Sequence, residues 1–223
     1  MNEFEKFDNF LKRYSEKSRH HQKLVNFVYP ELKKIEKCNI LEFGVSDQAM
    51  STELFLKYCI KKNCNLYSID NINYSKKFDD EKWKFILSRD DNFDYIKVQI
   101  PDVFGLILLD TIHEANHVEK IIYYYFDKLE LNSCFFIDDI NWIPYLKDAE
   151  KNRFYNEINN YETFQKLLEI YNSNRDNLSM EFTFEGTGMC KIKKLKSEPL
   201  KPSKKINHRQ SSVKNILRKI LKS

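Results

Sequence analysis

The sequence predicts an α/β protein in which helices flank a mostly parallel sheet. Short apolar segments alternate along the chain with segments of helical periodicity, the pattern typical of parallel sheets. Most of these apolar segments end in an acidic residue or a glycine, as expected where the carboxyl ends of parallel strands form a ligand-binding edge. With 223 residues, of which 42% are hydrophobic and 14% aromatic, the chain can bury one sizeable core, which excludes a disordered protein.

The amino-terminal segment, residues 1–38, is predicted to be helical and to precede the sheet. Phe4, Phe7, Phe10, Leu11 and Tyr14 mark the apolar face of a first amphipathic helix. A second helix is expected over residues 20–35, where Pro30 interrupts it because proline removes a backbone donor. We expect this segment to cover a ligand bound at the sheet.

The sheet itself is predicted over residues 39–195 and should contain seven strands. Five buried strands are expected at 39–43, 66–69, 84–87, 106–109 and 134–137, with the clearest intervening helices at 51–61 and 117–129. Beyond residue 141 we expect helices around 145–170. Strand patterns at 178–185 and 189–192 flank Gly186-Thr187-Gly188, which predicts an antiparallel hairpin at the end of the sheet.

Several protein classes are excluded or disfavoured by composition. The longest apolar runs fall far short of the roughly 20 residues that span a bilayer. The amino terminus has no basic and apolar signal-peptide pattern, so we expect a cytoplasmic protein. Five scattered cysteines without metal-binding spacing predict reduced packing residues, with one nucleophilic cysteine as the alternative.

Charge divides the chain into an acidic body and a basic tail. Residues 191–223 contain twelve Lys or Arg and one Glu, a net charge of +11, so the total of +4 leaves −7 for residues 1–190. Within the tail, 196–223, a Pro- and Ser-containing linker precedes a basic amphipathic helix marked by Val213, Ile216, Leu217, Ile220 and Leu221. We expect this tail to contact an anionic membrane from the inner face; a solvated, disordered tail is the alternative.

The first predicted strand leads into a loop with a single glycine, Gly44. A pyrophosphate-binding loop needs several glycines for close backbone approach, so a dinucleotide ligand is disfavoured. A ligand with an ammonium group and a ribose demands carboxylates instead. Glu42 and Asp70 supply them, and Asp70 follows the second strand, where it can accept both ribose hydroxyls.

These residues resemble the class I S-adenosylmethionine-dependent methyltransferases, which have a Rossmann-like fold. Glu42-Phe43-Gly44 matches the first motif of that family and Asp70 matches its ribose-binding acid. The resemblance implies that S-adenosylmethionine is the cofactor, that Glu42, Gly44, Ser46 and Asp70 bind it, and that Asp90 or Asp91 faces its adenine amino group. The loop departs from the family at Ser46 and Gln48, where many members keep glycine. A strand end followed by a simple turn is the alternative interpretation.

Three further carboxylates follow the fourth and fifth predicted strands. Asp110 ends one strand, and Asp138 and Asp139 end the next. Adjacent strands lie ~4.8 Å apart, so these acids should converge, and a hard divalent cation such as Mg²⁺ would hold them together. Helix or loop capping by Asp138 and Asp139 is the alternative.

This cluster resembles the metal site of divalent-metal-dependent O-methyltransferases of the catechol and macrolide-sugar types. Asp110 matches the aspartate after their fourth strand, and Asp138 with Asp139 matches their adjacent acidic pair. A metal-bound hydroxyl loses its proton more readily, and His113, three residues after Asp110, is the candidate general base. A surface histidine without catalytic function is the alternative, and His117 is a weaker candidate base.

The sequence therefore predicts O-methylation, assisted by a metal such as magnesium, of a hydroxyl on a sugar, a glycan or another small acceptor. Methylation of nucleic acid is a second hypothesis, which the acidic body disfavours. A catalytically silent methyltransferase-like interaction protein, attached through the basic tail to a membrane or a partner, is a third. The sequence leaves open whether the chain forms a homo-oligomer.

Overall fold

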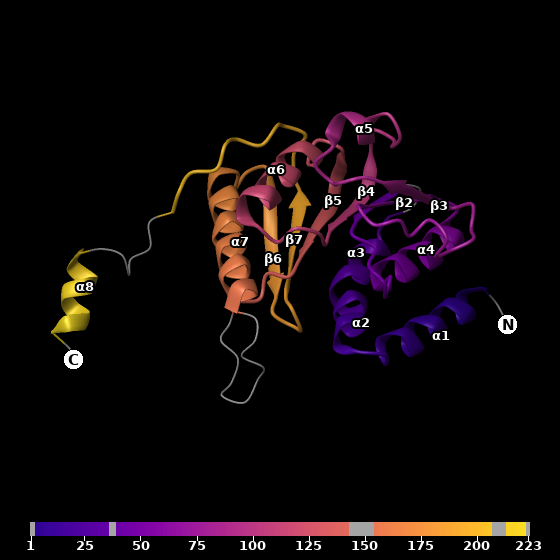
Figure 1. Cartoon of the computed structure of the whole chain (residues 1–223), viewed down its shortest axis with the longest axis horizontal. Helices are drawn as coiled ribbons and strands as arrows, with labels where there is room; N and C mark the ends of the chain where they lie inside the picture. Colours follow the sequence, from indigo (N-terminus) through magenta and orange to yellow (C-terminus); the bar gives the residue numbers. More distant parts are fainter. Residues whose placement is uncertain (1–2, 36–38, 143–153, 207–212, 222–223) are drawn as a thin grey trace.

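The computed structural model describes residues 3–35, 39–142, 154–206 and 213–221, apart from some side chains at the start of α1 and α7 and within α8 (Figure 1). Its sheet has seven strands in the order β3-β2-β1-β4-β5-β7-β6. Neighbouring strands among the first five are parallel, whereas β7 pairs antiparallel with both β5 and β6. The predicted fold class, a mostly parallel sheet with an antiparallel hairpin at its end, is confirmed.

The strands occupy the predicted positions to within about two residues, except that β5 begins five residues before the expected 134–137. They are β1 (Ile40–Phe43), β2 (Leu66–Asp70), β3 (Trp83–Leu87), β4 (Phe104–Leu109), β5 (Leu129–Asp138), β6 (Leu178–Thr183) and β7 (Met189–Lys194). The helices that connect them are α4 (Met50–Lys62), α5 (Phe93–Lys97), α6 (Ala115–Tyr125) and α7 (Phe154–Ser173). Of the helical region expected at 145–170, residues 145–153 lie outside the described part of the chain.

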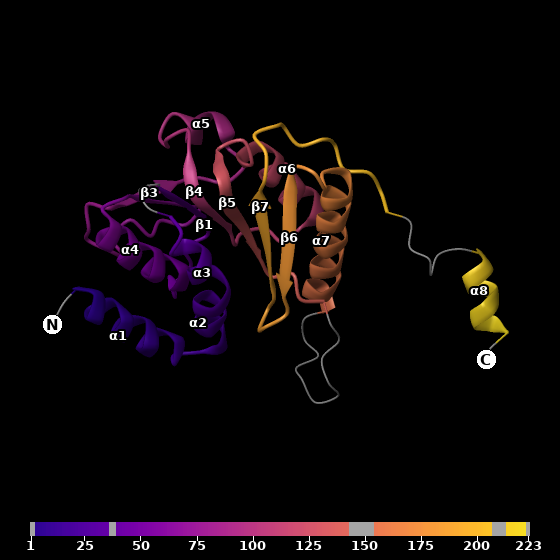
Figure 2. The same ribbon diagram turned by 180° about the vertical axis from the view of Figure 1, so that it is seen from behind.

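Helices cover both faces of the sheet (Figure 2). Alternate residues of β4 show the division, because successive side chains of a strand point to opposite faces. Ile107 and Leu109 pack in one core with α6 and α7, while Leu106 and Leu108 pack in a second core with α4 and the amino-terminal helices. The central strands β1 and β4 are therefore buried at every position, which explains their largely apolar sequences.

The amino-terminal segment forms α1 (Glu3–Ser15), α2 (Arg19–Lys23), a π-helical turn η1 (Leu24–Val28) and α3 (Tyr29–Leu32). Pro30 lies at the start of α3, directly after the π-helical turn. The helical segment thus changes its winding next to Pro30, where the sequence predicted an interruption.

One predicted boundary is wrong. The helix expected to continue to residue 129 ends at Tyr125, and Leu129 begins β5. Leu129 fits the apolar periodicity of the helix and also the buried start of a strand, so periodicity alone could not separate the two.

The described cysteines behave as packing residues. Cys59, Cys64, Cys134 and Cys190 are buried and form no disulfide in this part of the chain. Cys38 lies outside it. Among the described helices, none has the length and apolarity needed to cross a membrane.

Gly44 is required by close packing between β1 and β4. Its φ of +92° is in the left-handed region, and a Cβ atom there would collide with the backbone carbonyl of Asp110. Gly186 in the β6–β7 turn has a φ of +60°, but an added Cβ would meet its nearest neighbours, ring atoms of His20, only at 3.9 Å. Substitution of Gly186 would therefore add only backbone strain, whereas substitution of Gly44 would add strain and a steric collision.

We predict that Gly44→Ala lowers the free energy of unfolding by at least about 3 kcal/mol, because it adds a collision with backbone to the left-handed strain. Gly186→Ala, the matched control, should cost only about 1–2 kcal/mol. Urea denaturation of both variants measures the difference, and equal losses would contradict the packing role of Gly44.

Candidate active site

A cavity opens at the carboxyl ends of β1, β2 and β4. It has a volume of about 330 Å³, and Gly44, Asp70 and Asp110 contribute to its wall. The other lining residues are Ser46, Ile69, Asn71, Ile72, Tyr74, Ser88, Arg89, Asp90, Thr111 and Ile112. The sheet thus brings four predicted cofactor residues, Gly44, Ser46, Asp70 and Asp90, to one cavity.

Asp70 organises the loop that follows β1. Its Oδ2 accepts a hydrogen bond from the backbone N–H of Val45 at 2.8 Å, and its Oδ1 accepts one from the N–H of Ile72 at 2.8 Å. Within the same loop, Ser46 and Ala49 have φ values of 60° and 46°. A carboxylate oxygen has more than one lone pair, so Asp70 keeps capacity to accept ligand hydroxyls.

Asp90 and Asp91, the two candidates after β3, have different surroundings. Asp90 is buried, accepts a hydrogen bond from the Thr111 hydroxyl and lies 2.8 Å from His117 Nε2. Asp91 is paired with Arg89 at 3.0 Å and Lys120 at 3.4 Å, and the Arg89 guanidinium lowers the pKa of Asp91 to about 2. Asp90 lines the cavity, whereas Asp91 does not. His117 is held against Asp90 and not against the acidic cluster.

Glu42 is buried beneath the loop and does not line the cavity. Its Oε2 accepts hydrogen bonds from Ser68 at 2.6 Å and Thr52 at 2.9 Å, while Oε1 has no partner among the described residues. Burial raises the pKa of Glu42 from 4.5 to about 7. We infer that Glu42 supports the loop from below, because Thr52 belongs to α4 and Ser68 to β2.

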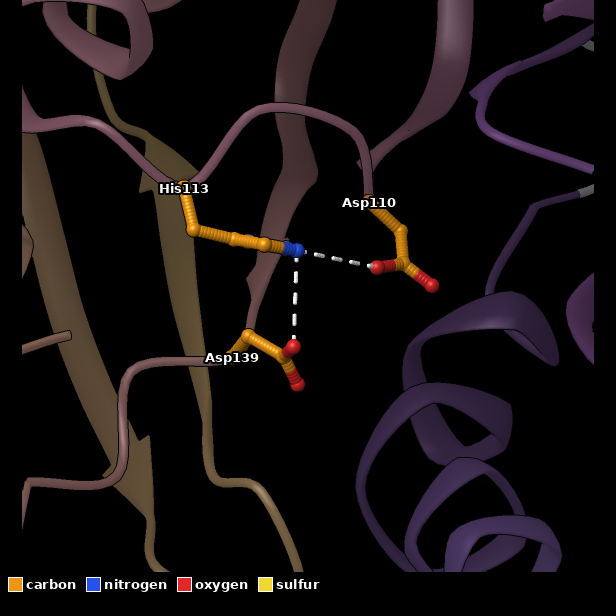
Figure 3. A group of neighbouring side chains, drawn as sticks. All are labelled: Asp110, His113 and Asp139. Carbon is orange, nitrogen blue, oxygen red and sulfur yellow. Dashed lines mark ion pairs between the residues drawn. The ribbon is translucent and has the colours of Figure 1, made fainter. Parts of the chain in front are cut away.

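The acids at the ends of β4 and β5 converge as expected. Leu109 is in register with Ile137, so Asp110 and Asp138 end neighbouring strands. His113 Nε2 lies 3.7 Å from Asp110 Oδ1 and 3.4 Å from Asp139 Oδ2 (Figure 3). One ligand atom from each of these three residues lies within 4.8 Å of the other two. This geometry is suited to a cation.

The carboxylates of this cluster affect one another. Desolvation, together with the charges of Asp138 and Asp139, raises the pKa of Asp110. Since 40% of the Asp110 side chain is exposed, we attribute more of this shift to the two charges than to desolvation. Asp139 has a φ of 54°, and its backbone N–H donates to Asp138 Oδ1 at 2.8 Å. The left-handed backbone lets two consecutive acids reach the same edge.

Lys23, from α2, enters this cluster and was not predicted. Its Nζ forms an ion pair with Asp138 Oδ1 and donates to Thr187 Oγ1 at 2.8 Å and to the Gly188 carbonyl at 3.3 Å. The lysine side chain is only 1% exposed. Asp138 is therefore held by an ammonium group, and the residues available to a cation are Asp110, His113 and Asp139.

The amino-terminal helices close one side of the site. His20, Lys23 and Leu24 line a small cavity of about 30 Å³ together with Ser46 and Asp110. Tyr14, in α1, donates a hydrogen bond to the carbonyl of Met50 at the start of α4. The amino-terminal segment thus borders Asp110 and is tied to the start of α4.

The sheet order and the helices on both faces define a Rossmann-like class I methyltransferase fold, and solved structures support this assignment. The sequence matches no protein-family model and no curated protein. MycE, a methyltransferase from the mycinamycin biosynthetic pathway, has a TM-score of 0.62 and 13% identity over 84% of this chain. This chain spans 55% of MycE.

Two smaller proteins are similar over more of their own length. The methyltransferase PaMTH1 from Podospora anserina has a TM-score of 0.61 at 12% identity, covering 87% of this chain and 88% of that one. A Staphylococcus aureus protein assigned as a caffeoyl-CoA O-methyltransferase has a TM-score of 0.56 at 13% identity, covering 83% and 91%. At these identities the likeness establishes the fold.

Glu42 should make stability depend on pH. The folded-state pKa, about 7, lies above the ordinary value of 4.5, so the native state binds the extra proton between these pH values. The free energy of unfolding should therefore fall as pH rises through this window, by up to about 3 kcal/mol from this group. Glu42→Gln removes the titrating group, so we predict that the variant gains stability relative to the wild type between pH 4.5 and 7.5.

Urea denaturation of both proteins at several pH values measures this difference. A stability difference that does not change with pH would contradict a raised pKa at Glu42.

Proposed function

We propose that the protein transfers a methyl group from S-adenosylmethionine to a hydroxyl of a small acceptor such as a sugar, with a divalent cation at the acidic cluster. The observation that carries this proposal is the position of Asp110. It lines the cavity that contains Gly44 and Asp70, and it also belongs to the cluster with His113 and Asp139. A methyl donor and a hydroxyl acceptor bound at these two places would meet at Asp110.

The cavity residues fit the proposed cofactor. Gly44 presents backbone without a side chain, and Asp70 offers carboxylate oxygens to ribose hydroxyls. The carboxylates of Asp70 and Asp110 also favour a ligand with positive charge, which a sulfonium carries. When bound, S-adenosylmethionine supplies an electrophilic methyl group for in-line displacement. The volume of about 330 Å³ lies within the usual range of ligand pockets.

The donor set of the cluster fits a hard divalent cation. Asp110 and Asp139 offer carboxylate oxygens, the ligands that Mg²⁺ prefers. A bound cation would lower the pKa of an acceptor hydroxyl and orient its oxygen. Asp138, predicted as a third carboxylate ligand, instead has its charge compensated by Lys23. We therefore assign the cation to Asp110 and Asp139.

His113 is the proposed acceptor of the hydroxyl proton. Its Nε2 lies within 4 Å of two carboxylates. Thr163 Oγ1 donates to the backbone carbonyl of His113 at 3.1 Å, which ties the loop to α7. The chain thus holds the base beside the cluster.

The similar structures give further support to this reaction class. MycE was solved with Mg, SAH and mycinamycin VI, and PaMTH1 with SAH. The Staphylococcus protein is assigned as an O-methyltransferase. These properties belong to those proteins, and the assignment to this chain depends on its own carboxylates and histidine.

Methyl transfer from isotopically labelled S-adenosylmethionine to a panel of sugars, glycans and catechols tests the proposal. We predict transfer that requires Mg²⁺ and stops with EDTA. Asp70→Ala should raise the KM for the cofactor at least about tenfold, and Asp139→Asn should lower kcat about 100-fold. Asp94→Asn is the matched control, since Asp94 is exposed on α5 and outside the cavity and the cluster.

Circular dichroism verifies that each variant is folded. A folded wild-type protein that neither binds S-adenosylmethionine nor transfers its methyl group would overturn the proposal, and transfer that is insensitive to EDTA would remove its metal component.

A further inference from the structure

The carboxyl-terminal helix α8 (Val213–Ile220) presents an apolar face to solvent. Val213 is 73% exposed, Leu217 is 53% exposed and Leu221, directly after the helix, is 84% exposed. Their spacing of four residues places these side chains on one face of a helix. Both views show α8 apart from the sheet and the helices that flank it (Figures 1 and 2).

An eight-residue helix of this kind needs a surface to bind. Isolated helices shorter than about 12–15 residues are marginally stable in water, because nucleation is costly and few hydrogen bonds offset it. The body of the protein leaves Val213, Leu217 and Leu221 exposed, so it does not supply that surface. The apolar face of α8 is therefore suited to a surface outside the chain.

The charge of the segment identifies the surface. Lys214, Arg218 and Lys219 lie between the apolar residues and Lys222 follows the last of them, while residues 213–223 contain no acid. Two of the twelve basic residues counted in 191–223, Lys191 and Lys194, belong to β7. Lys191 is paired with Glu31 and Glu181, and Lys194 is buried against backbone carbonyls. Of the other ten Lys or Arg residues in 191–223, nine follow residue 195.

We propose that α8 binds the interface of an anionic lipid bilayer, with its apolar face among the acyl chains and its basic residues at the lipid phosphates. A basic polar face opposite an apolar face is the composition of interfacial helices. Nucleic acid would satisfy the basic residues but leave the apolar face in water. The net charge of −7 on residues 1–190 means that an anionic surface attracts the tail and repels the body.

The linker before α8 holds the body close to such a surface. Asn174 accepts from the N–H of Lys201 at 2.7 Å and donates to its carbonyl at 2.9 Å, and Tyr123 donates to that carbonyl at 2.6 Å. Further along, the N–H of Ile206 donates to Glu169 of α7 at 3.2 Å. The helix begins seven residues after this last contact, a span of at most about 25 Å. Bound to a bilayer, α8 would keep the site near the membrane surface.

Flotation of the full-length protein with phosphatidylcholine vesicles, with and without 30% phosphatidylglycerol, tests the proposal at about 0.1 M salt. We expect at least about tenfold more protein on the anionic vesicles, and a large decrease at about 0.5 M salt. A variant with Val213→Asp and Leu217→Asp should lose binding. Val98→Asp is the matched control, because Val98 is 77% exposed but lies on the body after α5.

Thermal unfolding of the variants shows whether the body is intact, and labelled single-stranded RNA serves as the competing ligand. Equal binding to neutral and anionic vesicles, vesicle binding that survives both aspartate substitutions, or binding to RNA without binding to vesicles would each overturn the proposal. The outcome is independent of methyl transfer, because the proposal concerns α8 and not the cavity.

Discussion

The site depends on compensation of charge among carboxylates that the sheet forces together. Asp110, Asp138 and Asp139 follow adjacent parallel strands, so the backbone leaves them little freedom to separate. Lys23 supplies one positive charge from another part of the chain, and its buried ammonium group is itself tolerable only because Asp138 and two oxygen acceptors surround it. The amino-terminal helices and the acidic edge therefore stabilise each other.

The same edge carries much of the unusual backbone of the described chain. Gly44, Ser46, Ala49 and Asp139 all have positive φ values and all lie in loops that follow β1 or β5. Gly44 brings the first loop against the backbone of Asp110, and Asp70 fixes that loop through the N–H of Val45. Two cores on opposite faces of the sheet hold these loops in place. Four of the eight positive-φ residues in the described chain thus lie where the proposed donor and acceptor would meet.

Much of this arrangement could be predicted from the sequence, because strand ends are marked by a change from apolar residues to an acid or glycine. That pattern places Gly44, Asp70, Asp110 and Asp139 at one edge of a parallel sheet. The sequence pattern does not show which of the acids at this edge forms an ion pair. Lys23 and Asp138 are 115 residues apart, and a lysine on an amphipathic helix gives no signal that it will be buried. The sequence also did not show that Asp90 lines the cavity and Asp91 does not. This difference arises because Asp90 contacts Thr111, whereas Asp91 contacts Arg89.

A double-mutant cycle on Lys23 and Asp138 tests most directly whether their ion pair joins the amino-terminal helices to the site. Each single variant, Lys23→Met and Asp138→Asn, should lower the free energy of unfolding by about 3 kcal/mol, because it leaves the other charge without its partner. The double variant should lose little more than the worse single variant, which gives a coupling energy of about 2 kcal/mol or more. Strictly additive losses would show that the two residues act independently and would contradict this account.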